Sequence, residues 1–475
     1  MTRPLQTSDR EAWLMRGGIA AGAALVLLAI VGLVAVLGGS PTTAAQSPAS
    51  LADATARVRG SVYLVSFVTA SGTRIDNATA FVVAMPDGTK ALGTAGHVVA
   101  KLNELLANPG AKGFSVVVTS TAGPEFRTHH VRDMRVHPAF FAHANVAVPL
   151  FYALRDAGFN AQARTPSAYD AALMFVDDPE NLGEPVTFAE PERLYALAPG
   201  ETVFALGFPG ENITGTNPLR PEPVLMAGVL SAAMTPFFEQ GPPETRVQLL
   251  MSLTPAGGAS GSPIFDASGA LIGVLSAGET TRVTDLESGG DRRVMTMGAL
   301  AYASRADMLA AEIDGSAASG LAALKAQWAE AAARLMPKFE TVVADNVRQA
   351  AVAWHVAPDA IVKANAFEGT MQYASDKYPG RRIAVFDIPN AAAGRYILIA
   401  QSAEPRLMRL AIASFDSPDT PVIAPKKTGG PIVTQMLNLG GGYRGLRVTL
   451  VDETPDPAMQ SGPAGAVTLE VWRAP

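Results

Sequence analysis

Short apolar runs separated by polar turns dominate the middle of the chain. Between about Ala56 and Ile313, runs such as SVYLVSFVTA, GFSVVVTS and ETVFALGF alternate with segments rich in Gly, Pro and Asp. Many strands with such turns, and few long helical patterns, favour an all-β barrel or sandwich. We therefore expect a mainly β domain over residues 56–313.

The pattern becomes helical after about Ser316. Five apolar residues, spaced 3, 4, 3 and 4 positions apart, form one seam along a helix. They are Leu321, Leu324, Trp328, Ala331 and Leu335. Pro337 interrupts this helix, and a second one is expected from about Lys338 to Trp354. Because the seam covers only two heptads, we expect residues 314–355 to be a helical connector packed on a neighbouring domain, not a coiled coil.

Strand patterns return in the last part of the chain. The runs GRYILIAQ, MRLAIASF and AVTLEVW have the composition and length of β-strands. We expect residues 356–475 to form a separate, small β-sandwich.

A long apolar segment lies near the N-terminus. Residues 17–39 contain no charged or strongly polar side chain. About 20 apolar residues in a helix span a hydrocarbon core of roughly 30 Å, whereas the apolar part of a cleaved signal usually has only about 7–15. We therefore expect a transmembrane anchor at 17–39, with secretion after cleavage within residues 41–50 as the alternative.

The flanking charges indicate how such an anchor is oriented. Arg3, Arg10 and Arg16 precede the apolar segment, and no Lys or Arg follows it until Arg57. By the positive-inside rule, residues 1–16 are expected in the cytoplasm and the body of the protein in the periplasm or outside the cell. The Ser, Pro, Thr and Ala content of residues 40–55 is typical of a linker.

Composition excludes several classes of function. The 475 residues include 37 Lys and Arg against 43 Asp and Glu, a formal net charge of −6. This balance argues against nucleic acid as a partner, because phosphate binding needs concentrated positive charge. The chain has no cysteine, which excludes disulfides, thiolate zinc sites and a Cys nucleophile. His129 and His130 are adjacent, but no third ligand has metal-like spacing, so we expect no metal and no cofactor.

Three segments carry residues suited to acyl transfer. His97 lies in ALGTAGHVV, Asp170 in SAYDAALMFV and Ser260 in the glycine-rich TPAGGASGSPIFD. A serine hydroxyl is a poor nucleophile until a base such as a neutral imidazole removes its proton. A buried carboxylate can hold that imidazole in the correct tautomer. The glycines before Ser260 allow backbone N–H groups to converge on one point, where an oxyanion can be stabilised.

Together these segments resemble the three signature segments of chymotrypsin-like serine peptidases, the trypsin-fold family. The resemblance rests on TAGH, YDAALMFV and GGASGSP in the order His, Asp, Ser. It implies two six-stranded antiparallel β-barrels with the active site between them. It also implies that His97 is the general base, Asp170 its orienting carboxylate and Ser260 the nucleophile, with the N–H groups of Gly258 and Ser260 as the oxyanion hole.

Two departures from the family pattern affect these assignments. His97 and Asp170 are 73 residues apart, so an insertion is expected between about Lys101 and Ala168. Asp133 is the rival carboxylate, but it precedes the VHPAF run where the pattern does not place the aspartate. Ala259 replaces the aspartate that pairs with a freed N-terminus in many digestive enzymes. In this respect the chain resembles bacterial stress peptidases of the high-temperature-requirement type.

The resemblance also places a substrate pocket. Its bottom is expected near Thr254 and near three residues of the LSAG run, Ser276, Ala277 and Gly278. Thr254 stands where trypsin-type enzymes keep an acidic residue for Lys or Arg substrates. A small or medium apolar side chain before the scissile bond is therefore expected, while Glu279 leaves a basic one open.

The leading hypothesis is a membrane-anchored serine endopeptidase that cleaves protein or peptide substrates through an acyl-enzyme. The alternative is a catalytically silent trypsin-fold module that binds proteins through its C-terminal domain, which faintly resembles the β-rich accessory domains of secreted bacterial peptidases. An α/β-hydrolase is excluded because its order is Ser, Asp, His, and only His355 follows Ser260.

Overall fold

The computed structural model of the chain describes most of its residues after 49. These are 50–107, 110, 112–120, 127–156, 168–210, 222–278, 280–284, 291–295, 300–373, 381–404, 406–423, 430–453 and 465–475. The expected anchor at 17–39 lies outside them. Within the described ranges, no helix combines the length and apolar character needed to cross a bilayer.

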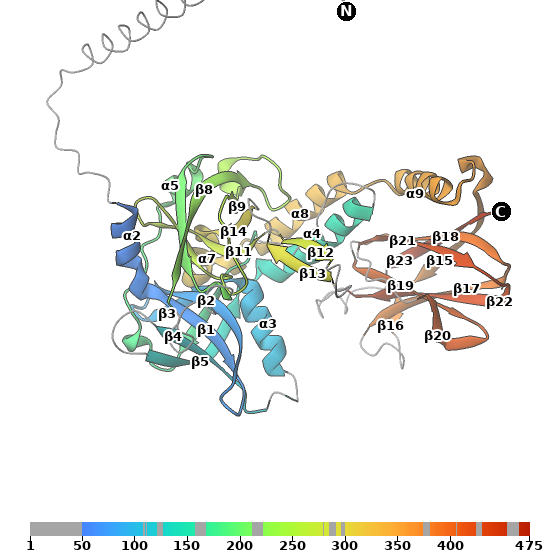
Figure 1. Cartoon of the computed structure of the whole chain (residues 1–475). Coiled ribbons are helices and arrows are strands. Elements are labelled where there is room, and N and C mark those ends of the chain that lie inside the picture. Colours follow the sequence, from blue (N-terminus) through green and yellow to red (C-terminus); the bar gives the residue numbers. More distant parts are fainter. Residues whose placement is uncertain are drawn as a thin grey trace, which may run out of the picture. The chain divides into compact units, whose positions relative to one another are not determined.

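Six antiparallel strands close into a first barrel, drawn in blue and green in Figure 1. Their order around the barrel is β1-β2-β3-β6-β5-β4, so β3 and β6 are neighbours although 77 residues separate their ends in sequence. The strands are β1 (Val62–Val68), β2 (Arg74–Ala84), β3 (Lys90–Thr94), β4 (Ser115–Ser120), β5 (Arg127–Val136) and β6 (Ala172–Val176). A helix, α2 (Leu51–Val58), precedes β1, and Ser50 and Asp53 cap its N-terminus reciprocally.

A second barrel of six antiparallel strands follows. Its order is β10-β11-β14-β9-β8-β7. The strands are β7 (Thr202–Gly207), β8 (Val224–Met234), β9 (Gln248–Met251), β10 (Pro263–Asp266), β11 (Leu271–Gly278) and β14 (Ala301–Arg305). Two further strands, β12 (Thr280–Thr284) and β13 (Asp291–Met295), form a separate hairpin. One cluster of buried apolar side chains runs through both barrels, with Phe81 and Leu92 in the first and Phe204 and Phe265 in the second. The two expected six-stranded barrels are therefore confirmed.

Helices connect and flank these strands. After β14, α7 (Ala306–Asp314) returns to the first barrel, where the Leu309 side chain lies against Gly93 so closely that a Cβ at Gly93 would be 2.7 Å from it. Other short helices are α3 (Gly96–Ala107), α5 (Pro191–Tyr195) and single turns at Arg59–Ser61, Pro179–Asn181, Pro243–Thr245, Ser316–Ala318 and Pro358–Ala360.

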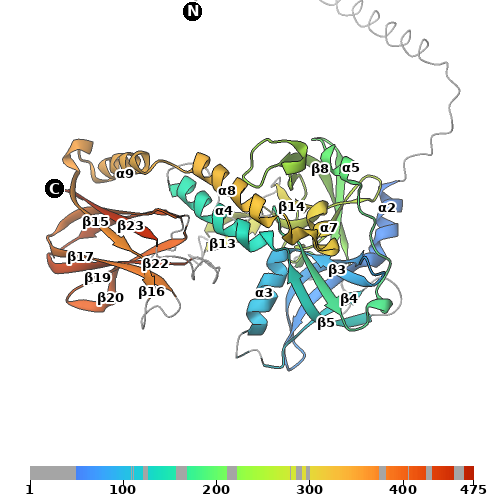
Figure 2. The ribbon, with the colours of Figure 1, turned by 180° about the vertical axis from the view of Figure 1, so that it is seen from behind.

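The insertion expected between His97 and Asp170 includes a long helix, α4 (Ala139–Asp156). Helix α8 (Leu321–Leu335) lies beside α4, as both Figure 1 and Figure 2 show. The predicted apolar seam of α8 makes this contact, because Trp328 is buried in one cluster with Leu150 of α4. The first half of the expected helical connector therefore packs on α4.

The C-terminal part consists of two antiparallel sheets around their own core. The four-stranded sheet has the order β15-β23-β18-β21 and the five-stranded sheet β16-β17-β22-β19-β20. Apolar side chains of both sheets share one buried cluster, as in a sandwich. Helix α9 (Phe339–Trp354) packs on this part through Val342, Val343 and Ala350. The strands are β15 (Val362–Thr370), β16 (Gln372–Tyr373), β17 (Arg382–Ala391), β18 (Gly394–Ser402), β19 (Met408–Ser414), β20 (Ser417–Ile423), β21 (Ile432–Leu439), β22 (Tyr443–Asp452) and β23 (Ala466–Ala474).

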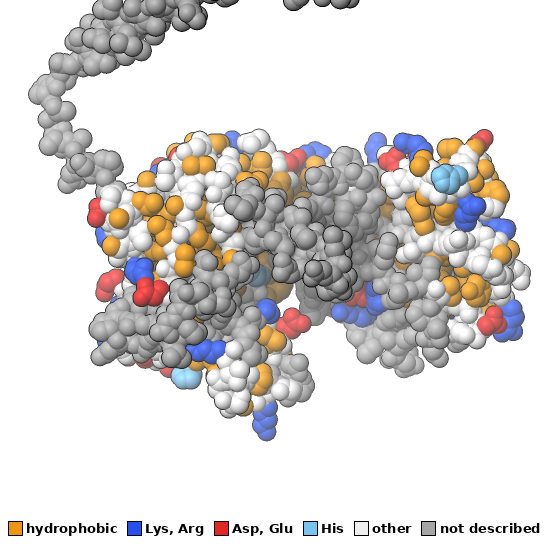
Figure 3. Space-filling view, in the orientation of Figure 1, with side chains coloured by type: hydrophobic (Ala, Val, Ile, Leu, Met, Phe, Trp, Pro, Cys, Tyr) orange, Lys and Arg blue, Asp and Glu red, His pale blue; other side chains and the backbone are white. Residues whose placement is uncertain are grey.

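Charged side chains are scattered over the face drawn in Figure 3. Lys and Arg lie among Asp, Glu and apolar side chains instead of gathering in one basic patch on the coloured part of this face. This distribution gives no support to a nucleic-acid surface there.

Candidate active site

His97 is positioned by the junction between a strand and a helix. β3 ends at Thr94 and α3 begins at Gly96, so His97 lies in the first turn of that helix at the edge of the first barrel. Its side chain is 31 % exposed. The backbone N–H of His97 donates to Oδ1 of Asp170 at 2.7 Å, and the ring Nδ1 lies 2.7 Å from Oδ2 of the same carboxylate. One carboxylate therefore fixes both the backbone and the ring of His97.

Asp170 reaches His97 through the order of strands in the barrel. It precedes β6, and Thr94 of β3 pairs with Ala172 of β6, which brings the two residues together across the 73-residue separation. The segment that carries Asp170 is held on both sides, because the His137 N–H donates to the Ala171 carbonyl and the Ser304 hydroxyl to the Ala168 carbonyl, each at 3.0 Å. The Asp170 carboxylate itself is fully buried.

Ser276 provides a third donor to this carboxylate. Its hydroxyl, on β11 of the second barrel, donates to Oδ2 of Asp170. Hydrogen-bond donors offset the cost of burying a carboxylate, and here both barrels supply them. Sequence reasoning assigned Ser276 to the substrate pocket and missed this contact. No local signal could have shown it, because the contact depends on how the two barrels pack.

Ser260 lies in the connection between β9 and β10, held against the first barrel. Its carbonyl accepts a hydrogen bond from the Thr79 N–H at 2.8 Å, and the Thr79 hydroxyl donates to the Gly258 carbonyl at 3.0 Å. Gly261 has φ +84°, and a Cβ there would lie 2.1 Å from the Thr79 carbonyl oxygen. Glycine at 261 is therefore required by both its φ and the close approach of β2.

Two backbone donors belong to the loop that carries the Ser260 hydroxyl. Gly258 has φ +93°, a conformation in the left-handed region that favours glycine. Within the described part of the chain, the N–H groups of Gly258 and Ser260 have no protein acceptor. Both residues line the same pocket as His97. These two N–H groups are therefore candidate donors to an oxyanion formed at Ser260.

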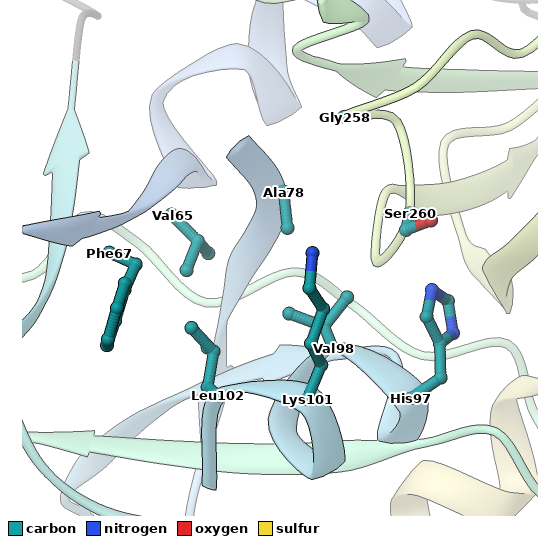
Figure 4. Close-up of a pocket in the computed structure, with 9 residues that line it drawn as sticks. All are labelled: Val65, Phe67, Ala78, His97, Val98, Lys101, Leu102, Gly258 and Ser260. Atoms are coloured by element: carbon teal, nitrogen blue, oxygen red, sulfur yellow. The ribbon is translucent and has the colours of Figure 1, made fainter. Parts of the chain in front are cut away.

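The Ser260 hydroxyl donates to the Ser276 carbonyl at 3.3 Å and not to His97. Figure 4 shows Ser260 and His97 next to each other at one end of the pocket. Hydrogen bonds between a nucleophile and its base are often long or misaligned without substrate. The hydroxyl must turn toward the ring before His97 can take its proton.

The charge of Asp170 sets the protonation of His97. Burial of the ring lowers its pKa, but the Asp170 charge and hydrogen bond outweigh that effect, so the His97 pKa is raised above its ordinary value of 6.5. The positive charge of Lys101 opposes the increase. An ionised carboxylate only accepts, so Nδ1 carries the proton of the neutral ring and Nε2 is left without one.

Other candidate residues lie elsewhere. Asp133 is exposed on β5 and lies 3.6 Å from Arg135, so the structure brings Asp170 and not Asp133 to His97. His129 is buried with its Nδ1 2.9 Å from Asp178, while the adjacent His130 is exposed. In the ranges that the structure describes, no group of three His, Asp or Glu side chains is placed to hold a metal ion.

The residues expected at the substrate pocket do not line the cavity at Ser260. Thr254 is exposed after β9, and Ala277 and Gly278 are half-buried at the end of β11. Glu279 lies outside the residues whose side chains are described. The cavity beside His97 and Ser260 has a volume of about 220 Å³, and none of the expected pocket residues lines it. Its walls come from β1, β2 and α3.

A larger cavity of about 470 Å³ lies away from His97 and Ser260. It is bounded by residues 235–247, α7 and α8, and Tyr169, the neighbour of Asp170, forms part of its wall. The smaller cavity is the candidate active site because His97, Ser260 and Gly258 all line it.

Comparison with known proteins agrees with this geometry over part of the chain. Residues 78–274 match the model of a trypsin-like peptidase domain. Among solved structures, Deg5 is 18% identical, with 48% of this chain and 83% of that chain covered at a TM-score of 0.31. Rv3671c from M. tuberculosis H37Rv, a serine-to-alanine mutant in its inactive form, is 19% identical, with 57% and 94% covered at a TM-score of 0.30.

A separate comparison with curated proteins found no match to the chain. The match to the family model covers His97, Asp170, Ser260 and ten of the twelve barrel strands in whole or in part. Residues 78–274 are therefore similar to a trypsin-like peptidase domain, and the two closed six-stranded barrels that contain them have the trypsin-like fold.

Proposed function

We propose that this protein is a serine endopeptidase that hydrolyses peptide bonds through an acyl-enzyme. Ser260 is the nucleophile, His97 the general base and Asp170 the carboxylate that orients it. Ser276 is a positioning residue, because its hydroxyl acts on Asp170 and not on substrate. The N–H groups of Gly258 and Ser260 form the oxyanion hole.

The chemistry proceeds in two balanced steps. The Ser260 Oγ bonds to the substrate carbonyl carbon while its proton passes to Nε2 of His97. The C–N bond then breaks, the same proton goes to the leaving amine, and an acyl ester remains on Ser260. Water attacks this ester with His97 again as the base, the acid is released, and the proton returns to Oγ.

One observation carries the proposal. The buried Asp170 carboxylate holds both the N–H and the Nδ1 of His97 at 2.7 Å, in a cavity that also contains Ser260 and Gly258. A purely structural histidine would need neither a free backbone donor nor a hydroxyl beside it. The match of residues 78–274 to a trypsin-like peptidase domain supports the same function.

The test is covalent labelling with a fluorophosphonate, which reacts only with an activated serine. We expect labelling of the wild type and of Ser268→Ala, an exposed serine in the β10–β11 turn. We expect no labelling of Ser260→Ala. A folded wild type that is neither labelled nor able to cleave an unstructured protein such as casein would support the alternative, a silent binding module.

Two further parts of the proposal rest on the sequence. Residues 17–39 anchor the protein in the membrane, with the catalytic barrels on the periplasmic or outer side. Replacing eight of these residues by Ser and Asn should release the chain from the membrane fraction. The residue before the scissile bond is small or medium and apolar, since Thr254 carries no charge. A peptide library varied at that position tests this, and strong Arg or Lys selectivity would contradict it.

A further inference from the structure

The larger cavity, of about 470 Å³, takes no part in the proposed catalysis. Its volume is that of roughly 16 water molecules at about 30 Å³ each, and it lies within the range of about 300–1,000 Å³ that is usual for small-molecule sites. Residues 235–247 contribute to its wall, together with α7, α8 and the turn between these helices. The cavity at His97 and Ser260 shares no lining residue with it.

A large part of the wall is apolar. On α8, Leu324, Trp328 and Ala331 are spaced four and three positions apart, so they lie on one side of the helix, and all three line the cavity. Phe237 and Tyr169 add two further aromatic rings to the wall. A ligand with an aromatic body would displace water from these side chains and could pack on the rings, and both effects favour binding.

His137 brings a buried hydrogen-bond donor to this wall. It is 3 % exposed, and burial lowers the pKa of its ring to about 4, so the ring is neutral at about pH 7. Its Nδ1 accepts from the Ala139 N–H at 3.1 Å, which leaves the single ring proton on Nε2. Within the described part of the chain, no group accepts from Nε2. Because buried donors are rarely left without a partner, this N–H indicates an acceptor supplied from the cavity.

The charged groups at the cavity argue against an anionic ligand. Glu239 and Arg334 both line it, and they are already paired by two hydrogen bonds of 2.7 and 2.6 Å. Glu244 lines it too, and among the described residues its carboxylate has no cationic partner. The negative charge of Asp307 acts on the His137 ring. A cation beside that ring is disfavoured as well, because the Nε2–H group presents the positive end of its dipole.

We propose that this cavity binds an uncharged molecule that has an aromatic body and a carbonyl or hydroxyl oxygen. The oxygen accepts from Nε2 of His137, and the aromatic body packs against Trp328. The site adjoins the segment that carries Asp170, since Tyr169 lines the cavity and the His137 N–H donates to the Ala171 carbonyl at 3.0 Å. Binding there goes beyond the proposed peptidase function and does not depend on it.

The test is equilibrium dialysis of naphthyl methyl ketone against the full-length protein in detergent. This probe is uncharged, with a two-ring aromatic body and one carbonyl oxygen. We expect saturable binding with a Kd between about 10 µM and 1 mM, as for a small ligand that buries most of its surface. Naphthoate has nearly the same shape but carries a negative charge, so it should bind at least about tenfold more weakly.

Two substitutions on α8 locate the bound probe. Ala331→Trp fills part of the cavity and should weaken binding by at least about 20-fold. Ala329→Trp introduces the same side chain at an exposed position of the same helix, outside the cavity wall, and should leave the Kd unchanged within about twofold. Because all proteins are measured in the same detergent, partition of the probe into micelles cancels from the comparison.

A third substitution tests the hydrogen bond. His137→Phe keeps a ring in the wall and removes the donor, so it should weaken binding of naphthyl methyl ketone by about 3- to 10-fold. Ethylnaphthalene has no acceptor, and its Kd should differ by less than about twofold between the wild type and His137→Phe. An equal loss for both probes would show that the substitution only disturbs the wall, and the proposed hydrogen bond would be refuted.

The outcomes separate this site from the proposed active site. A fluorophosphonate on Ser260 should leave the Kd of naphthyl methyl ketone unchanged, and blocked binding would place the probe at the active site and refute the inference. A protein that binds the probe but is never labelled at Ser260 would refute the peptidase function alone. No saturable binding to the wild type up to about 1 mM, or tighter binding of naphthoate, overturns the proposal even if Ala331→Trp does not fold.

Discussion

Replacing Asp170 by Asn is the sharpest test of the proposed catalytic machinery. The two side chains have nearly the same shape, but one carboxylate oxygen becomes an NH₂ group. Oδ1 accepts from the His97 backbone N–H, and Oδ2 accepts from the His97 ring and from Ser276. Neither orientation of the amide can accept all three of these hydrogen bonds.

The two orientations are unfavourable for different reasons. With its NH₂ toward the ring, the variant amide would force Nδ1 to accept and Nε2 to carry the proton, so His97 could no longer act as the base. With its NH₂ toward the backbone, two N–H groups would oppose each other in a buried site, at about 1–3 kcal/mol. In both cases the charge that stabilises imidazolium is lost, worth about 4 kcal/mol at 4 Å in an effective dielectric of about 20.

These effects predict a loss of about 5–7 kcal/mol in transition-state stabilisation, a fall in kcat/KM of about 10⁴- to 10⁵-fold. The assay is kcat/KM on a chromogenic peptide across pH 5–9, with Asp133→Asn as the matched control because Asp133 is exposed on β5. Without the carboxylate, burial and the Lys101 charge both lower the His97 pKa, so the residual activity of Asp170→Asn should begin at lower pH than in the wild type. Near-wild-type activity of Asp170→Asn, or crippled activity of Asp133→Asn, would refute the assignment.

Three other predictions follow from the same contacts. The wild-type kcat/KM should rise with increasing pH through a pKa above 6.5, because only neutral His97 accepts a proton and its pKa is raised. A pH profile of kcat/KM whose rise is centred below pH 6 would contradict this. Gly258→Ala introduces a Cβ at φ +93° and should turn the 258 N–H away from the oxyanion, lowering kcat by about 10²- to 10³-fold, as stopped-flow acylation would show. Arg305 is buried and donates to Asp307 and to the carbonyls of residues 243, 244 and 246, so Arg305→Met should lower the free energy of unfolding in urea by about 3–5 kcal/mol. The exposed Arg348→Met should change it by less than about 1 kcal/mol.

Several parts of the fold could be predicted from local sequence patterns. The short apolar runs and turn residues of 56–313 indicated many short strands, and the resemblance of three segments to a known family indicated how they close into barrels. The spacing of Leu321, Leu324 and Trp328 indicated the buried side of α8, which the structure places against α4. Such features are local, because they depend on which side chains lie on one face of one element.

Features that depend on contacts between distant elements could not be predicted in this way. The Ser276 hydroxyl meets Asp170 only because β11 of the second barrel lies against the segment before β6 of the first. The cavity at Ser260 requires β1, β2 and α3 to be packed before Phe67 and Leu102 can share a wall. Helix α9 likewise packs on the C-terminal sheets, which the sequence pattern of a helical connector did not specify.

The division of the site between two barrels has a consequence for the chain during its synthesis. His97 and Asp170 belong to the first barrel, whereas Ser260 is made 90 residues after Asp170 and Ser276 later still. At about 5–20 residues per second, the nucleophile leaves the ribosome roughly 5–20 s after the carboxylate. Thr79 of the first barrel must then bind the Ser260 loop through its N–H and its hydroxyl. Under the proposed function, the order of translation itself keeps the nascent peptidase inactive until its second barrel has closed.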